Sequence, residues 1–329
     1  MTWTPDAPRF PLLDGPSPLH RLPRFAGALG SPSDPEIWIK REDLLPLAFG
    51  GNKLRNLEFL VGAALADGAD CLITSGRRWS NHCRLTAAAG ARAGLEVHLV
   101  LTGPPVGAPG ANERLEQLMG AHLNTTTTED RAERAATVEA LAASLRAAGR
   151  RPYVIDVGGT GVTGALGQVL AGLEIAAQSV ALGLAPDAIV VPTATGGTQA
   201  GLVVGLALAG AEIAVVGVAV AHPAADVRPA VMGLAGELGI LARLGDSWHP
   251  DIRVEDTHPV SDYGRRDPAA DQAAALLART EGILVDPIYT AKALAWFVAQ
   301  ARDGAFAGGT VVFWHAGGTP GLFEALEPA

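Results

Sequence analysis

The sequence predicts an α/β protein built from two doubly wound, open-sheet lobes with mostly parallel strands. Short apolar runs typical of buried strands alternate with segments whose apolar residues recur at helical spacing. Strands joined through helices form right-handed parallel units, and the chain contains more than eight such alternations. With 329 residues the chain is long enough for two sheets.

The elements follow from local patterns taken in chain order. Proline and glycine crowd the first 35 residues, which predicts an irregular N-terminal arm. Residues 125–130 are predicted to form a loop, and the stretch between 220 and 268 to be less regular. Strands are predicted at 36–40, 71–74, 97–101, 153–156, 188–191, 213–220 and 310–314, and helices at 52–66, 81–93, 112–119, 131–148, 167–183, 199–209, 268–280 and 291–302.

The composition argues against several classes of protein. Hydrophobic residues make up 48% of the chain and charged residues 18%, which supports a buried core. The net charge of −9 and the lack of a basic stripe argue against a nucleic-acid partner. No stretch reaches the roughly 20 apolar residues of a membrane helix, and no signal-peptide pattern is present, so we expect a cytoplasmic protein. Cys71 and Cys83 are expected to be free thiols, and no metal site is expected beside them.

Lysine is scarce in this chain. Of the 25 basic residues, only Lys40, Lys53 and Lys292 are lysines. Arginine stays protonated at any working pH, whereas a desolvated lysine can lose its proton and attack a carbonyl. Lys53 follows two glycines at the start of a predicted helix, so it is a candidate Schiff-base residue. The alternative is a solvated surface lysine.

Three further loops lie where a predicted strand gives way to a helix, the edge at which open parallel sheets bind ligands. In residues 75–82, Ser80 or Asn81 would cap the next helix, which is the alternative to a role at a site. Residues 192–201 are rich in glycine and threonine, and their N–H groups, hydroxyls and helix dipole suit a single phosphate. An ordinary tight turn is the alternative there. The third loop is 285–290.

One further motif indicates a different cofactor. Residues 159–164 match Gly-x-Gly-x-x-Gly after a predicted strand, as in dinucleotide-binding folds. That fingerprint also needs an acidic residue at the end of the next strand, and Asp187 lies before that strand instead. An NAD(P)-dependent oxidoreductase is therefore a weakly supported alternative.

Taken together, the motifs resemble the pyridoxal-phosphate enzymes of the tryptophan synthase β-like family (fold type II). Within that family they resemble the branch of 1-aminocyclopropane-1-carboxylate deaminase and D-cysteine desulfhydrase. The matching segments span nearly the whole chain: Lys-Arg-Glu-Asp at 40–43, Ala-Phe-Gly-Gly-Asn-Lys at 48–53, Ser-Asn-His at 80–82, Thr-Gly-Gly-Thr-Gln-Ala-Gly at 195–201, Asp-Pro-Ile-Tyr-Thr at 286–290 and His-Ala-Gly-Gly at 315–318.

The resemblance implies a pyridoxal 5'-phosphate cofactor, a small amino-acid substrate and a homodimer. It also implies a smaller lobe at residues 54–168, inserted between parts 1–53 and 169–329 of a larger cofactor-binding lobe. Lys53 would form the Schiff base, Asn81 would bond the 3′-oxygen of the cofactor, and residues 195–198 would hold its phosphate. Catalytic roles are implied for Lys53, Ser80, Tyr263 and Tyr289, cofactor contacts for Asn52, Lys53, Asn81, Thr195, Gly196, Gly197, Thr198 and Thr290, and substrate contacts for Trp79, Ser80, Asn81 and His82.

Thr290 would lie near the pyridine nitrogen of the cofactor, where the resemblance implies glutamate in the deaminases. A carboxylate would keep that nitrogen protonated and make the ring a strong electron sink. The neutral threonine would leave the nitrogen less protonated. Such a sink suits the departure of a good β-leaving group better than the opening of a cyclopropane ring.

The segment before Ser80 departs from the family pattern Gly-Gly-x-Gln-Ser-Asn. Here residues 75–81 read Ser-Gly-Arg-Arg-Trp-Ser-Asn. Arg77, Arg78 and Trp79 would alter the pocket beside the substrate carboxylate, because arginine pairs well with carboxylates and sulfonates. Alternatively, the arginines face solvent and Trp79 packs between the lobes.

The sequence therefore predicts a lyase that is most similar to D-cysteine desulfhydrases, eliminating a β-substituent to give pyruvate and ammonia. Alternatives with the same cofactor are ring-opening deamination, racemisation and β-replacement. A member of the fold that binds ligand without catalysis is a further alternative.

Overall fold

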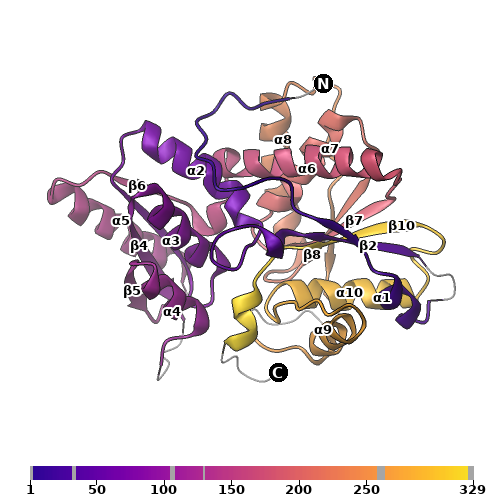
Figure 1. Cartoon of the computed structure of the whole chain (residues 1–329). Helices are drawn as coiled ribbons and strands as arrows, with labels where there is room; N and C mark the ends of the chain where they lie inside the picture. Colours follow the sequence, from indigo (N-terminus) through magenta and orange to yellow (C-terminus); the bar gives the residue numbers. More distant parts are fainter. Residues whose placement is uncertain (1–2, 32–34, 104–107, 129, 258–263, 325–329) are drawn as a thin grey trace.

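The computed structural model describes residues 3–31, 35–103, 108–128, 130–257 and 264–324. These residues form two sheets, which lie side by side as two lobes in Figure 1. The larger sheet has the strand order β1-β2-β10-β7-β8-β9, and only β1 and β2 run antiparallel. Its strands are β1 (Leu19–Arg21), β2 (Glu36–Arg41), β7 (Ala188–Thr193), β8 (Ala214–Ala219), β9 (Arg253–Asp256) and β10 (Thr310–His315).

The smaller sheet has the strand order β5-β4-β3-β6 and is parallel throughout. Its strands are β3 (Cys71–Arg77), β4 (Glu96–Thr102), β5 (His122–Thr126) and β6 (Pro152–Val154). The predicted fold class, α/β with two mostly parallel sheets, is confirmed.

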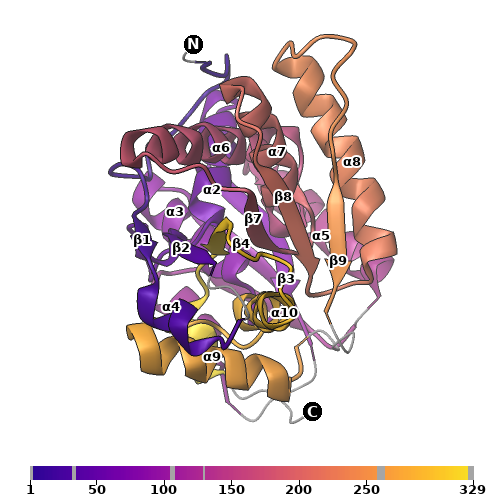
Figure 2. The same ribbon diagram turned by 90° about the vertical axis from the view of Figure 1, so that its right-hand side faces the viewer.

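Helices cover both faces of the larger sheet. The helices are α1 (Pro23–Ala28), α2 (Lys53–Ala66), α3 (Asn81–Ala93), α4 (Ala111–Leu118), α5 (Arg131–Ala147), α6 (Val162–Leu182), α7 (Gly197–Ala209), α8 (Ala224–Leu241), α9 (Pro268–Glu281) and α10 (Thr290–Arg302). α6 and α7 pack on one face of the larger sheet, and α1, α9 and α10 pack on the other (Figure 2). The strands of the smaller sheet all lie within residues 54–168, and α6 runs through residue 168. The division of the chain into lobes at residues 53/54 and 168/169 stays a prediction.

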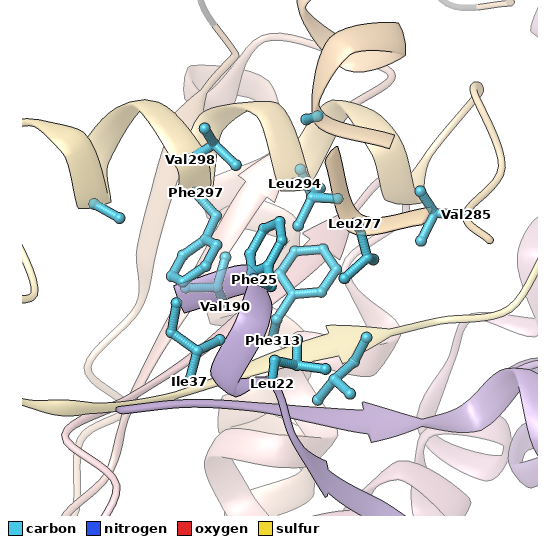
Figure 3. Packing of buried hydrophobic residues seen from close by; sticks show 14 of the residues in the cluster. Leu22, Phe25, Ile37, Val190, Leu277, Val285, Leu294, Phe297, Val298 and Phe313 are labelled. Carbon is cyan, nitrogen blue, oxygen red and sulfur yellow. The ribbon is translucent and has the colours of Figure 1, made fainter. Parts of the chain in front are cut away.

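The core under α1, α9 and α10 is rich in aromatic side chains. Figure 3 shows Phe25, Phe297 and Phe313 converging between the helices and the sheet, and all three are fully buried. The ring centroids of Phe297 and Phe313 lie 5.9 Å apart. Burial of each such side chain stabilises the fold by about 1.5–3 kcal/mol. This layer therefore anchors α10, whose first residue is Thr290.

α6 begins earlier than the predicted residue 167 and includes three glycines, which a helix disfavours in isolation. A Cβ at Gly167 would lie 1.9 Å from the carbonyl oxygen of Arg55 in α2, and a Cβ at Gly164 would lie 2.1 Å from that of Gly159. Only glycine permits this approach, so the tertiary contact overrides the local preference.

α6 also differs from the expectation that no stretch is long enough to cross a membrane. It is the one helix of the described chain that is long and apolar enough by length and composition. However, 56% of its apolar window is buried, and it packs against α2 and α7. This burial is that of a core helix.

Three stretches are more regular than predicted. Residues 125 and 126, predicted as loop, belong to β5, which pairs in register with β4. The sheet hydrogen bonds thus outweigh the weak local pattern of a threonine run. α8 occupies much of the stretch between 220 and 268 although it contains Pro229. The N-terminal arm, predicted as irregular, contains β1 and α1.

A buried network of ion pairs joins the N-terminal arm, β2, α2 and α6. The Arg55 guanidinium donates to both carboxylate oxygens of Glu42, at 2.7 and 2.9 Å, and to both of Glu174, at 2.9 Å each. The Lys40 ammonium donates to Glu174 and to the Ser17 carbonyl oxygen. Lys40, Glu42 and Arg55 are almost completely buried. Two cations and two carboxylates compensate one another, as burial of charge requires.

Replacing Glu42 by glutamine should lower the free energy of unfolding by about 3–5 kcal/mol, because the change leaves an uncompensated positive charge in the interior. The measurement is the urea dependence of unfolding for each purified protein. Glu36→Gln is the matched control, since its partner Arg21 is largely exposed, and it should cost less than about 1 kcal/mol. Equal effects of the two changes would contradict the assigned role of the network.

Candidate active site between the two sheets

A cavity of about 870 Å³ opens between the two sheets and is lined by residues of both lobes. The smaller sheet contributes the carboxyl end of β3, with the first half of α5 beside it. The larger sheet contributes the carboxyl end of β7 and the N-termini of α7 and α10. All four loops selected from the sequence reach this cavity, as expected at the carboxyl ends of parallel strands.

Lys53 is the first residue of α2, is half-buried and lines the cavity. Its ammonium donates to the carbonyl oxygen of Gly158 at 2.8 Å. Burial lowers the pKa of Lys53 from 10.5 to about 8. Among the described residues no carboxylate forms a salt bridge with it to oppose that change. An appreciable share of the amine is thus unprotonated near neutral pH, as a nucleophile requires.

The N-terminus of α7 lines the same cavity and has the features of an anion cradle. Gly196 precedes the helix with φ of 86°, a left-handed conformation that favours glycine. Gly197 and Thr198 follow it, and Thr195 precedes it on the cavity wall. The amide of Asn52 donates to the Thr198 hydroxyl at 2.8 Å, which ties the cradle to the turn before Lys53. First-turn N–H groups and the helix dipole suit a phosphate dianion.

Ser80 and Asn81 both line the cavity at the start of α3. The Ser80 hydroxyl oxygen accepts from the N–H of Cys83 at 3.2 Å, so Ser80 is the N-cap of the helix. The capping explanation therefore holds for Ser80 and is compatible with a second role toward the cavity. The Asn81 side-chain oxygen accepts from Arg84 at 3.2 Å, which orients its amide.

His82 is a buried, neutral side chain on the same wall. The Thr74 hydroxyl donates its hydrogen to the carbonyl oxygen of Ile155. Its oxygen also lies 2.9 Å from Nε2 of His82, so Nε2 is the donor in that contact. Nδ1 is then an acceptor, and it is buried without a hydrogen-bond partner among the described residues. Burial, together with the charge of Lys53, lowers the pKa of His82 to about 3.

The turn before α10 is organised by Asp286. Its buried carboxylate accepts the N–H groups of Ile288, Tyr289 and Thr290 at 3.0, 2.7 and 3.1 Å. Tyr289 and Thr290 thereby line the cavity. The buried Thr290 hydroxyl donates to the Gly317 carbonyl oxygen at 3.2 Å, so a neighbouring ligand atom would meet its lone pairs and no formal charge.

The three residues before Ser80 that depart from the family pattern have different surroundings. Arg77 lines the cavity. Arg78 pairs with Glu113 of α4 at 2.8 Å. Trp79 is not among the described lining residues, and its ring packs so closely on Gly264 that a Cβ there would lie 2.4 Å from it. Tyr263 lies outside the described residues, so its role stays a prediction.

The segment just before the Gly-x-Gly-x-x-Gly motif, which ends at Gly158, lines the same cavity. Gly158 receives the Lys53 ammonium, and Thr160 donates to the Thr195 hydroxyl at 2.6 Å. A dinucleotide fold needs the strands on either side of the following helix in one sheet. Here β6 and β7 belong to different sheets, so the motif lacks the structural context of the oxidoreductase alternative.

The structure also shows site residues that the sequence patterns did not identify. Arg131 of α5 donates to His222, which follows β8, at 2.7 Å, and both line the cavity. Gln168 of α6 donates to the carbonyl oxygen of Asn52 at 2.8 Å. His315 donates from Nε2 to the Leu284 carbonyl and accepts on Nδ1 from Gly317. His315 stood in a matching segment, whereas the other three residues carried no sequence signal.

Residues 11–317 match the family of pyridoxal-phosphate dependent enzymes, and the chain belongs to that family. Its cofactor is pyridoxal phosphate. The chain is 40% identical to D-cysteine desulfhydrase of Salmonella choleraesuis (strain SC-B67), over 96% of this chain and 95% of that protein.

Solved structures agree with this assignment. A crystal structure of a 1-aminocyclopropane-1-carboxylate (ACC) deaminase homologue superposes with a TM-score of 0.88 at 36% identity, covering 97% of this chain and 94% of that one. The processed form of threonine deaminase isoform 2 from Solanum lycopersicum shares the fold. Its TM-score is 0.66 at 18% identity, covering 92% of this chain and 79% of that one.

The cavity residues fit pyridoxal phosphate. The lowered pKa of Lys53 suits an amine that bonds the cofactor's aldehyde, and the glycine-rich start of α7 on the cavity lining suits its phosphate. His82 Nδ1, buried and without a partner among the described residues, offers an acceptor on the wall beside Asn81. The specific contacts predicted for these residues remain proposals.

Recapture of the cofactor after its removal should accelerate as pH rises through about 8. Only the unprotonated amine attacks an aldehyde, and burial moves the pKa of Lys53 to that value. The measurement is the rate at which visible absorption returns when pyridoxal phosphate is added to cofactor-free protein. Lys53→Ala should show no such band and no borohydride fixation. If the rate instead rose with a midpoint near pH 10.5, the ordinary pKa of lysine, the amine would be shown to be solvated.

Proposed function

We propose that the protein is a pyridoxal-phosphate-dependent lyase that eliminates the β-substituent of a small amino acid, with D-cysteine as the leading candidate substrate. The products would be pyruvate, ammonia and the leaving group, hydrogen sulfide in the case of D-cysteine. The observation that carries the proposal is the neutral, buried Thr290, which lines the same cavity as Lys53. The similarity to D-cysteine desulfhydrase over nearly the full chain supports it.

Lys53 would have two duties. Its amine would hold the cofactor, and Nζ would act as the base that takes the α-proton of the substrate. A base works best when its pKa lies near the working pH, and the value of about 8 meets that condition. When bound, the cofactor supplies an electron sink for the α-carbon. The carbonyl oxygen of Gly158, 2.8 Å from Nζ, is placed to receive and orient the protonated amine.

The remaining cofactor contacts would be made by rigid elements. Gly196, Gly197 and Thr198 at the start of α7, with Thr195 before them, would hold the phosphate. Asn81 would bond the 3′-oxygen, and Thr290 would stand beside the ring nitrogen. Because the Thr290 hydroxyl donates to Gly317, it would present lone pairs and no formal charge to that nitrogen. This arrangement would favour a reaction in which the leaving group itself accepts much of the negative charge.

Ser80 and Tyr289 would position the substrate and move protons at its β-side, with Tyr263 as a further candidate. Tyr289 is held by its N–H bond to Asp286, and Ser80 by its cap to α3. Arg131 of the smaller lobe and His222 of the larger one meet at the cavity wall. Their contact would help to exclude water while the reaction proceeds.

Ring-opening deamination is the second candidate, because the ACC deaminase homologue is similar in structure. Thr290 speaks against it, since breaking an unactivated carbon–carbon bond needs the stronger sink that a carboxylate provides. Racemisation or β-replacement would use the same Lys53. We further propose a homodimer, on the basis of the family resemblance, and a cytoplasmic protein with no nucleic-acid or membrane partner, on the basis of its composition and charge.

A product assay separates these reactions. Elimination from D-cysteine should yield pyruvate and hydrogen sulfide in equal amounts, and 1-aminocyclopropane-1-carboxylate should yield little or no 2-oxobutyrate. L-Cysteine and β-substituted alanines with carboxylate or sulfonate groups complete the panel, because Arg77 lines the cavity. Inversion at the α-carbon without an oxoacid product would instead establish racemisation. Faster 2-oxobutyrate formation than pyruvate formation would overturn the proposal.

Tyr289→Phe should lower kcat about 10²- to 10⁴-fold, the range expected for loss of a general acid or base. The visible absorption of the bound cofactor should persist, because the turn is held by Asp286 through backbone N–H groups. Tyr153→Phe is the matched control, since Tyr153 lies on β6 and packs against the core of the smaller lobe. Steady-state rates of pyruvate formation give the comparison. Unchanged kcat in Tyr289→Phe would remove the tyrosine from the proton transfers.

A further inference from the structure

We propose that the protein has a second ligand site, for a zinc-type divalent metal ion, formed by Glu96, His98 and His122 on the smaller sheet. These residues lie at the amino ends of β4 and β5. The cavity lies at the opposite edge, where β3 ends with Arg77. The site is therefore separate from the cofactor and from the proposed elimination reaction.

The strand register brings the three side chains together. Glu96 and His98 are two residues apart on β4, so they share one face of the sheet. His122 is the direct parallel neighbour of His98 across the β4–β5 pairing. β5 is the edge strand. The His122 side chain is consequently 59% exposed, whereas that of His98 is only 10% exposed.

The candidate ligand atoms converge on one point. Oε1 of Glu96 lies 2.7 Å from Nε2 of His98 and 3.4 Å from Nε2 of His122. All three atoms lie within 4.8 Å of one another, and the two imidazole rings are stacked with centroids 4.8 Å apart. A tetrahedral zinc ion with bonds of about 2.0–2.2 Å holds its ligand atoms about 3.3–3.6 Å apart. The Glu96–His122 pair already has that separation, and the hydrogen-bonded Glu96–His98 pair would open to it. Small side-chain rotations would therefore complete the site.

The second oxygen of Glu96 is already held in place. Oε2 accepts from Arg150 at 2.7 Å, and Arg150 also pairs with Asp70 at 3.3 Å. Metal-ligating carboxylates are commonly oriented in this way by an outer hydrogen bond. Asp70 offsets the charge of Arg150, and Oε1 remains directed toward the two imidazoles.

The donor set defines the class of metal. Two imidazoles and one carboxylate suit Zn²⁺, or Co²⁺ and Ni²⁺ as substitutes, with water on the exposed side as a fourth ligand. Mg²⁺ and Ca²⁺ prefer oxygen ligands alone. A bound ion would join the edge strand β5 to β4 and should raise the thermal stability of the protein.

Equilibrium dialysis of untagged holoenzyme against Zn²⁺, after treatment with a chelating resin, tests the proposal. Wild type should bind one ion per chain, and His122→Ala should bind it at least about tenfold more weakly. Zn²⁺ should raise the Tm of wild type and leave that of His122→Ala unchanged. His20→Ala is the matched control, since His20 is an exposed histidine on the larger sheet, and it should behave as wild type.

Co²⁺ provides a second readout, because tetrahedral nitrogen and oxygen ligands give visible bands that hexahydrated Co²⁺ lacks. These bands should appear in wild type and be absent in His122→Ala and in His98→Gln. Zn²⁺ binding that is equal in wild type and His122→Ala, or absent in wild type, would overturn the site. Failure here leaves the pyruvate assay unaffected, because the exposed His122 lies far from the cavity edge of the sheet.

Discussion

The buried ion network around Arg55 is the interaction on which the placement of the reactive lysine depends. Arg55 stands two residues after Lys53 on α2, and its guanidinium holds Glu42 from the segment after β2 and Glu174 from α6. Because an unmatched buried charge costs several kcal/mol, the network tolerates few alternative arrangements. It therefore fixes α2 against both the larger sheet and α6. The position of the amine in the cavity is set by residues that never touch the ligand.

Close contacts at glycines between α6 and α7 also fix the position of the anion cradle at the start of α7. A Cβ at Gly205 of α7 would lie 2.8 Å from Cα of Gly172 in α6, and a Cβ at Gly201 would lie 2.4 Å from Gln168. The two helices can thus pack almost backbone to backbone, which no larger residue would allow. α7 begins at the cavity, and Thr195 just before it accepts a hydrogen bond from Thr160 in the turn before α6. Close helix packing thereby fixes the start of α7 relative to α6.

The fold class and the cavity loops were predictable because both are encoded locally. Each loop joins a recognisable apolar strand to a helix start, and parallel sheets bring such loops to one edge. The partners of those loops were not predictable. The contact from Lys53 to Gly158 spans 105 residues and that from Arg131 to His222 spans 91, so no local pattern encodes either. α8 was missed for the opposite reason, because Pro229 weakens a helix pattern that tertiary packing sustains.

Of the three residues that depart from the family pattern, two pack beside the cavity and one lines it. Arg78 and Trp79 are engaged with Glu113 and Gly264, so they shape the cavity from outside, whereas Arg77 brings a cation to its lining. A cation on the wall stabilises negative charge as it develops on a departing thiolate or oxyanion more than it stabilises the bound substrate. In the proposed reaction a neutral Thr290 would stand beside the ring nitrogen, so the leaving group would carry much of the negative charge itself. A weaker electron sink combined with a positive charge on the cavity lining would suit an elimination with an anionic leaving group.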